Sequence, residues 1–413
     1  MRGRAGLFAR FLRAEPHELP ALGWAFAYFF LLLAAYYVLR PVRDAMAVQA
    51  GSAALQQLFG WTFAAMLALV PLYGWLCARL PKARFLPLVY VFFVLNQIGF
   101  YFFPDPTLFF VWLSVFNLFA VSVFWSLMAD LFDRAQAARL FGVIAAGGSC
   151  GALAGPGLVV ALVPLLGADG MLLLSALLLL LALAAMARLI AWGRRHPRQG
   201  EPAPEEALGG SVLAGARAAL SSPYLLAICA WLFCYTVLST ALYFLQVEIV
   251  PKAIPGRAEQ LRFFATVDLV VNGLALILQL GVTARLGAAI GAGWMLALMP
   301  LFSLAGFAAL GLLPTLATLL VVGVVRRAGE FAISKPVREA LYTVVPREER
   351  YKAKSFIDTV VYRGGDAASG WAVTALRAAG LGLSGLAWAA LPVAGAWLAL
   401  SFWLGRKQSQ PRE

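Results

Sequence analysis

The chain has 413 residues, of which 62% are hydrophobic and only 13% are charged, and its mean hydropathy is +0.82. Soluble domains contain about 45–50% apolar and about 25% charged residues, so this composition excludes a water-soluble domain as the main structure. The formal net charge is +13, and the positions of the basic residues decide what that charge does.

Twelve hydrophobic stretches follow one another along the chain, each close to the length of about 20 residues that crosses a bilayer as a helix. They lie at about 20–39, 54–77, 85–103, 107–128, 140–165, 170–191, 222–249, 261–283, 288–312, 315–334, 356–379 and 382–404. We therefore predict an all-α membrane protein with twelve transmembrane helices in two six-helix repeats.

A linker rich in Pro, Gly and charged residues divides the twelve stretches six and six. The predicted organisation is an amphipathic cytoplasmic N-terminus, an N-terminal six-helix bundle, the cytoplasmic linker, a C-terminal six-helix bundle and a cytoplasmic tail. These parts span residues 1–19, 20–192, 193–221, 222–404 and 405–413, respectively.

Of the 33 Lys and Arg residues, 24 lie on one side of the predicted membrane if the N-terminus is cytoplasmic. This asymmetry is the positive-inside bias, and it places both termini in the cytoplasm. The basic charge is then topogenic, so we expect no nucleic-acid partner. A composition rich in Ala, Leu, Gly and Arg favours a bacterial inner (plasma) membrane.

The sequence contains no phosphate-binding glycine loop, nucleophile constellation or metal-ligand spacing, and its four cysteines lie in or at the ends of spans. We expect no enzymatic activity, cofactor or metal. The expected partners are the lipid bilayer and a small anionic solute, and we expect a monomer.

Charged residues at membrane depth are the candidate functional residues, because each costs on the order of 3 kcal/mol at the bilayer centre. The predicted substrate-binding residues are the arginines Arg40, Arg43, Arg326, Arg327 and Arg363. The predicted coupling or gate residues are Asp44, Asp268, Glu330, Lys335, Asp358 and Asp366.

Helical spacing pairs Arg40 with Asp44, Arg326 or Arg327 with Glu330, and Arg363 with Asp366. These pairs could therefore be structural ion pairs. Another small-residue pattern, Gly147, Gly148, Gly151 and Gly155, is best explained by close packing of two helices.

Two sequence echoes relate the halves of the chain. LYGWLCARLPKAR (72–84) has a counterpart in LQLGVTARLGAAI (278–290), and the segment leading into span five has one before span eleven. Two parallel six-helix repeats are the plan of the major facilitator superfamily, and the Gly-x-x-x-x-Arg turn after span two resembles its loop signature.

Three further segments resemble the ATP/ADP translocases, a divergent branch with the facilitator fold. They are FLRAEPHELPAL (11–22), YYVLRPVRDAMAV (36–48) and SKPVREALYTVVPREERYKAKSFIDTVV (334–361). The resemblance implies that Arg43 stands at a functionally needed Lys of that family. It also shows departures: Asp366 stands near a family Lys, Lys335 at a family Asp and Ser114 near a family acid.

The resulting hypothesis is a secondary transporter that works by alternating access on a nucleotide or another phosphorylated or anionic metabolite. One alternative is a proton-coupled transporter of a different anionic or zwitterionic solute. The other is a non-transporting scaffold or sensor, in which the charges only lock helices together.

Overall fold

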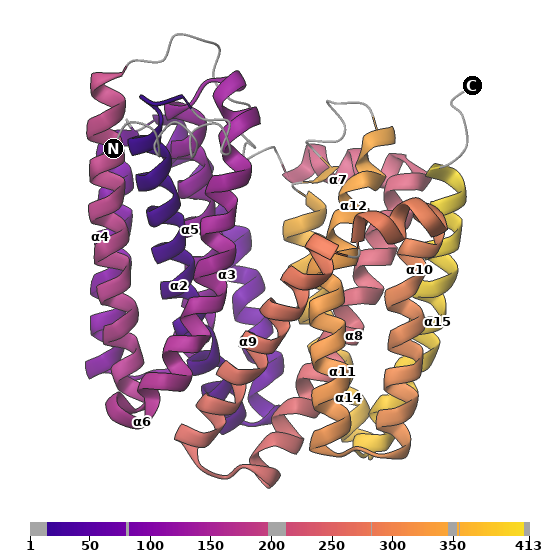
Figure 1. The fold of residues 1–413 in the computed structure, drawn as a ribbon. Coiled ribbons are helices and arrows are strands. Elements are labelled where there is room, and N and C mark those ends of the chain that lie inside the picture. The colour runs from indigo at the N-terminus through magenta and orange to yellow at the C-terminus, as the bar shows by residue number, and fades with distance from the viewer. Residues whose placement is uncertain are drawn as a thin grey trace. The chain divides into compact units, whose positions relative to one another are not determined.

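The computed structural model describes residues 15–79, 82–196, 212–281, 283–345, 353–354 and 356–408, and all regular structure within them is helical (Figure 1). Nine helices of this described part are long and apolar enough to cross a membrane. One of them, α6, contains two predicted spans, and two further spans are each built from a shorter α-helix joined to a π-helical turn. The all-α membrane fold is confirmed.

In the first half of the chain the helices match the predicted spans closely. They are α2 (Leu19–Ala50), α3 (Ser52–Arg79), α4 (Lys82–Phe102), α5 (Pro106–Leu131) and α6 (Arg134–Arg195). The predicted amphipathic segment before residue 15 lies outside the described residues.

The second half begins with α7 (Val212–Ser221), a helix inside the predicted linker. The long helices α8 (Pro223–Ala253), α9 (Arg257–Gly281) and α10 (Thr283–Leu312) follow. Helix α11 (Leu316–Gly329) continues through the π-turn η1 (Glu330–Ser334) into α12 (Lys335–Leu341) and the 3-10 turn η2 (Tyr342–Val344). The π-turn η3 (Ile357–Val361) leads into α14 (Tyr362–Ala378), and α15 (Leu383–Gln408) ends the described chain. Residues 197–211 of the linker and 409–413 of the tail are outside the described part.

Side-chain caps determine where several helices begin. The Asp105 side chain accepts a hydrogen bond from the Leu108 N–H, and Pro106 follows at the first helical position. At α6, Asp133 and Gln136 form a reciprocal capping box. These polar residues fix helix starts that hydrophobicity alone places only within a few residues.

Gly167 makes the break between the two spans of α6. Its φ of 70° is in the left-handed region, which a residue with a Cβ rarely adopts. The predicted turn between residues 165 and 170 is therefore confirmed. A second such glycine, Gly291 with φ 75°, kinks α10 near its start.

The described chain forms two compact units. Unit 1 contains residues up to Asp44, Leu72–Leu208 and Leu261–Leu269; unit 2 contains Ala45–Pro71, Gly209–Gln260 and Val270–Glu413. Helices α2, α3 and α9 each contribute to both units. The sequential division at the linker stays a prediction.

Within unit 1, α6 packs directly on α2 through its small residues. A Cβ on Gly151 would collide with the backbone oxygen of Phe30, and one on Gly155 would lie 2.7 Å from the backbone oxygen of Ala34. The glycines thus allow the two backbones to approach closely, which confirms the predicted packing face.

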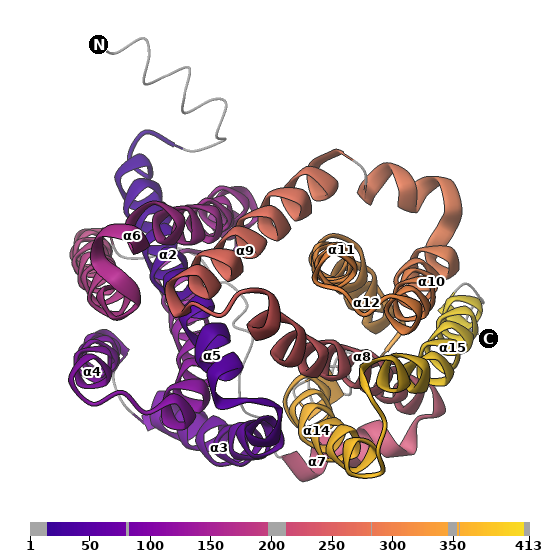
Figure 2. The same cartoon turned by 90° about the horizontal axis from the view of Figure 1, so that it is seen from below.

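Within unit 2, α10 and α15 pack along each other, and α8 packs against α14 and α15. Helix α11 packs against both α8 and α10 (Figure 2). This arrangement brings the charged residues of α11 next to α8, whose facing side chains are uncharged.

Candidate functional site

The structure places the predicted residues in two groups, one in each unit. Unit 1 holds Arg40, Arg43, Asp44 and Asp268. Unit 2 holds the seven others, on the helices around α11: Arg326, Arg327, Glu330, Lys335, Asp358, Arg363 and Asp366.

In unit 1 both arginines have an acidic partner. Arg40, on α2 just before Pro41, has its Nε 3.8 Å from Oδ2 of Asp268 on α9, and the Asp268 side chain is only 1% exposed. Arg43 Nη2 lies 2.8 Å from Asp44 Oδ1, and the Arg43 guanidinium lies over the Phe110 ring. Both cations are therefore compensated within the unit.

The pairing in unit 1 differs from the pairing that helical spacing predicts. Asp44 forms its ion pair with the adjacent Arg43, and the ion pair of Arg40, at 3.8 Å, is with Asp268. The ion pair that the structure gives to Arg40 is with Asp268, more than two hundred residues later in the sequence, because α9 packs against α2 there. Residue spacing within one helix carries no information about such a partner.

In unit 2 the most unusual side chain is Arg326. It is 5% exposed, and among the described residues its hydrogen bond runs from Nη2 to the Ser239 hydroxyl on α8, over 3.2 Å. Its guanidinium carbon lies 5.8 Å from the ring centres of both Tyr235 and Phe307. Nη1 is buried without a hydrogen-bond partner, and Arg326 forms no ion pair within the described residues.

Glu330 follows one turn after Arg326 and opens the π-turn η1. Its Oε2 is buried and has no hydrogen-bond partner among the described residues. The predicted ion pair with Arg326 does not form, because the Arg326 side chain turns toward Ser239 and the aromatic rings. A π-turn contains one extra residue, and such turns occur frequently at functional sites.

Side chains from α9 and α10 bind the backbone of the π-turn. Gln279 Nε2 donates to the carbonyl oxygen of Phe331 over 2.9 Å, and Thr283 Oγ1 donates to that of Ala332 over 2.9 Å. These bonds satisfy backbone groups that the irregular turn would otherwise leave open. The geometry that carries Glu330 is thus held from outside its own helix.

Helix α14 contributes the predicted pair of Arg363 and Asp366, whose Nη1 and Oδ2 are 3.5 Å apart. The Thr240 hydroxyl of α8 donates to Asp366 Oδ1 over 3.4 Å. Gly365 permits this contact, because a Cβ there would collide with Thr236 of α8. The predicted i,i+3 pairing on this helix is confirmed.

The remaining predicted residues lie on α11, α12 and η3 of the same unit. Asp358, in the π-turn η3, has Oδ1 3.6 Å from Arg338 Nη2. Lys335 is exposed, and Arg327 is half-buried. Arg338, which is 7% exposed, belongs to the translocase-like segment 334–361 and was not predicted as a site residue.

Three residues that contact the predicted group in unit 2 could not be predicted from the sequence. Tyr235, Ser239 and Thr240 are uncharged side chains in an otherwise apolar span, and only the contacts with α11 and α14 mark them. A hydroxyl in a transmembrane stretch is common, so spacing alone could not have selected them.

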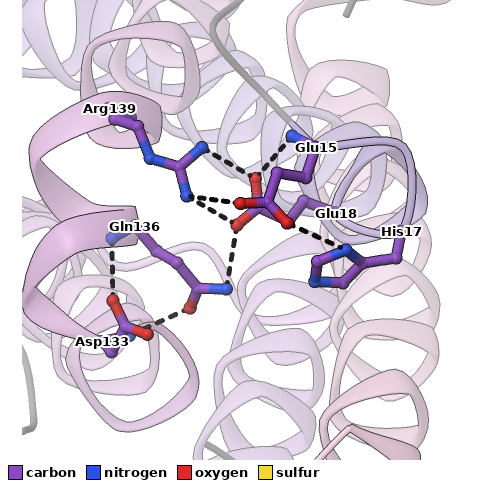
Figure 3. Close-up of polar contacts among 6 residues, drawn as sticks. All are labelled: Glu15, His17, Glu18, Asp133, Gln136 and Arg139. Atoms are coloured by element: carbon purple, nitrogen blue, oxygen red, sulfur yellow. Dashed lines mark hydrogen bonds and ion pairs between the residues drawn. The ribbon is translucent and has the colours of Figure 1, made fainter. Parts of the chain in front are cut away.

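A cluster of polar contacts at the start of α2 in unit 1 was also not predicted from the sequence (Figure 3). Glu18, 1% exposed, accepts hydrogen bonds from Arg139 Nη1 and Nη2 over 3.1 and 2.9 Å and from Gln136 Nε2 over 3.0 Å. Glu18 Oε2 also accepts from the Glu15 N–H over 2.8 Å. The cluster joins the start of α2 to the capping box of α6.

Burial raises the pKa of the Glu18 carboxyl, but the hydrogen bonds from the Glu15 backbone, Arg139 and Gln136 outweigh burial and hold the pKa below its ordinary value. Glu18 is therefore ionised at neutral pH. Glu15 and His17, which lie beside it, are exposed.

The sequence profile described as Major Facilitator Superfamily matches residues 23–250, which is more than half of the chain. The chain belongs to the Major Facilitator Superfamily. No curated protein sequence matches it significantly.

Solved structures of transporters share its fold. A bacterial homologue of the human lysosomal transporter Spinster, in an inward-facing and unoccupied conformation, is 14% identical, with 97% of this chain and 100% of that chain covered and a TM-score of 0.63. The POT family transporter PepTSo is 13% identical, with coverage of 94% and 98% and a TM-score of 0.67. A POT family transporter in complex with a thioalcohol-conjugated peptide is 12% identical, with coverage of 94% and 96% and a TM-score of 0.66.

Proposed function

We propose that this protein is a secondary transporter that carries a small solute with an anionic group by alternating access. The observation that carries the proposal is Arg326, a cation at membrane depth that is 5% exposed. Within the part of the chain that the structure describes, it is hydrogen-bonded only to a neutral hydroxyl, and its buried Nη1 has no hydrogen-bond partner. A charge in such a place is costly unless something pairs with it. An anionic substrate group would supply that partner.

The guanidinium is also well suited to this role. Ser239, Tyr235 and Phe307 fix its position without neutralising it, and an arginine fork binds carboxylate or phosphate through parallel hydrogen bonds. Arg40 and Arg43 each have an acid within 4 Å. Their arrangement favours a role as ion pairs that open and close during transport.

Among anionic solutes, a nucleotide or another phosphorylated metabolite is the candidate that the translocase-like segments favour, with exchange or uptake as the mode. A second candidate, proton-coupled transport of a different anionic or zwitterionic solute, is favoured by Glu330. Its buried Oε2, which has no hydrogen-bond partner among the described residues, lies at membrane depth one turn from Arg326, where protonation would change the charge of the site.

The test is transport by the full chain reconstituted in proteoliposomes. Vesicles are loaded with unlabelled ADP, and entry of labelled ATP is compared for the intact protein, Arg326→Gln and Arg43→Ala. The same vesicles are then tested with labelled phosphorylated and carboxylated metabolites, with and without an inward proton gradient. Arg262→Gln is the control, because Arg262 is exposed and its substitution changes the net charge by the same amount.

We expect flux of at least one anionic solute that Arg326→Gln lowers by about tenfold or more, as the loss of a charge-assisted hydrogen bond predicts, while Arg262→Gln keeps it. Flux that is equal in Arg326→Gln and intact protein would refute the role of Arg326. Folded, reconstituted protein that moves none of these solutes would favour the scaffold or sensor alternative.

A further inference from the structure

Two opposite charges, one helical turn apart, each keep a buried polar atom without a partner. Arg326 Nη1 is a donor and Glu330 Oε2 is an acceptor, and both lack a hydrogen-bond partner in the described part of the chain. Four residues of α-helix separate the two positions by about 6 Å along the axis. A pair of this kind ordinarily forms an i,i+4 ion pair, so the open atoms require an explanation.

The surroundings explain why the two side chains stay apart. The hydrogen bond to Ser239 and the rings of Tyr235 and Phe307 hold the Arg326 guanidinium against α8 and α10. Glu330 begins the π-turn, whose following carbonyl groups are bound by Gln279 and Thr283. The two charges are therefore held in position separately by neighbouring helices.

Two other arginines of unit 2 already have acidic partners. Arg363 pairs with Asp366, and Arg338 pairs with Asp358. A polyanion bound to the Arg326 guanidinium would also meet the Glu330 carboxylate, which repels it. The open atoms instead present one positive and one negative group.

We infer that the Arg326–Glu330 site binds a small zwitterion, whose anionic group contacts Arg326 and whose protonated amine contacts Glu330. This inference rests on the proposed transport function and specifies its substrate class. Tyr235 and Ser239 are positioning residues, because they act through Arg326. The rings of Tyr235 and Tyr362, with centres 6.2 Å apart, provide an apolar wall for the carbon chain between the two charged groups.

The experiment uses three probes with the same carbon chain: γ-aminobutyrate, its N-acetyl derivative and its amide. The first carries both charges, the second only the carboxylate and the third only the amine. Glycylglycine and ADP complete the set as a second zwitterion and a polyanion. Binding to the purified full-length protein is measured by ligand-induced thermal stabilisation and by calorimetry, and uptake is measured in proteoliposomes.

The variants are Arg326→Gln, Glu330→Gln and the charge exchange Arg326→Glu with Glu330→Arg. Exposed residues of the same types supply the controls Arg262→Gln and Glu259→Gln. We expect the zwitterions to bind at least about tenfold more tightly than either singly charged analogue, since the loss of one charge-assisted hydrogen bond weakens binding by about that factor. Glu330→Gln removes the preference for the free amine, and the control variants keep it.

Ser239→Ala and Ser239→Thr test the positioning role. We expect Ser239→Ala to raise KM for the zwitterion with little change in kcat, and Ser239→Thr to restore KM, because threonine keeps the hydroxyl. Equal KM values in Ser239→Ala and the intact protein would overturn this role.

The outcomes separate this inference from the proposed function. One outcome is ADP exchange that depends on Arg326 and is faster in Glu330→Gln than in the intact protein. That result would support anion transport but overturn the zwitterion site. Equal binding of γ-aminobutyrate and its N-acetyl derivative would also overturn it. No transport of any solute by folded protein would instead contradict the proposed function itself.

Discussion

Removing the Glu18 carboxylate gives the most quantitative test of the structure. The carboxylate is 1% exposed and accepts four hydrogen bonds, two of them from Arg139. A hydrogen bond to a charged group contributes about 1.5–3 kcal/mol. Because the Arg139 side chain is 31% exposed, water replaces part of what it loses. We expect Glu18→Gln to lower the free energy of unfolding by about 1.5–3 kcal/mol.

The pH dependence of stability has a definite sign. The pKa of Glu18 in the folded protein lies below its ordinary value of 4.5, so its contribution is present above pH 4.5 and is lost as the pH falls through the folded pKa. The apparent melting temperature of the intact protein in detergent should therefore fall more steeply below pH 4.5 than that of Glu18→Gln.

Glu15→Gln is the matched control. Glu15 lies in the same cluster, but its side chain is 61% exposed and its contact with Arg139 is 4.0 Å long, so we expect little change. A double-mutant cycle with Arg139→Gln measures the coupling directly. Equal melting of Glu18→Gln and Glu15→Gln, or a coupling energy near zero, would refute the reasoning.

Two other substitutions test packing and pairing. Gly151→Ala places a Cβ against the Phe30 carbonyl and should lower the free energy of unfolding by about 1–3 kcal/mol through overpacking. Gly142→Ala, which has open space around it, should be neutral or stabilising. Melting curves of both variants check this, and equal destabilisation by the two would contradict it. Arg377 pairs with Glu248 at 2.5 Å, so Arg377→Gln leaves the Glu248 carboxylate without a cation and should lower the melting temperature. Adding Glu248→Gln should restore part of the lost melting temperature. No recovery in the double variant would argue against the ion pair.

Hydrophobicity predicted the helices well because membrane spans require long apolar stretches. The start of α5 was predicted at 107 and is Pro106, and the break between residues 165 and 170 occurs at Gly167. The π-turns were not predicted. Gln279 and Thr283 of other helices bind the backbone of the turn η1, and such tertiary contacts cannot be read from local sequence.

The charged residues were predicted as functional because a charge in a bilayer costs free energy. The partner of a charged residue was predicted correctly only where the two residues lie on one helix. Arg363 and Asp366 pair as their spacing indicates. Glu18 and Arg139 are 121 residues apart, and no local rule relates them. Arg326 was selected for its charge, but only its contact with Ser239 shows that it is positioned without being neutralised.

The pair of Arg40 and Asp268 has a consequence for biosynthesis. Asp268 is synthesised 228 residues after Arg40, and at about 5–20 residues per second α2 enters the membrane roughly ten seconds to a minute before its partner on α9 exists. During that interval Asp44, one turn from Arg40 on the same helix, is the nearest acid in the nascent chain. The acid that pairs with Arg43 in the finished protein can therefore serve first as a temporary counter-charge for Arg40 during insertion.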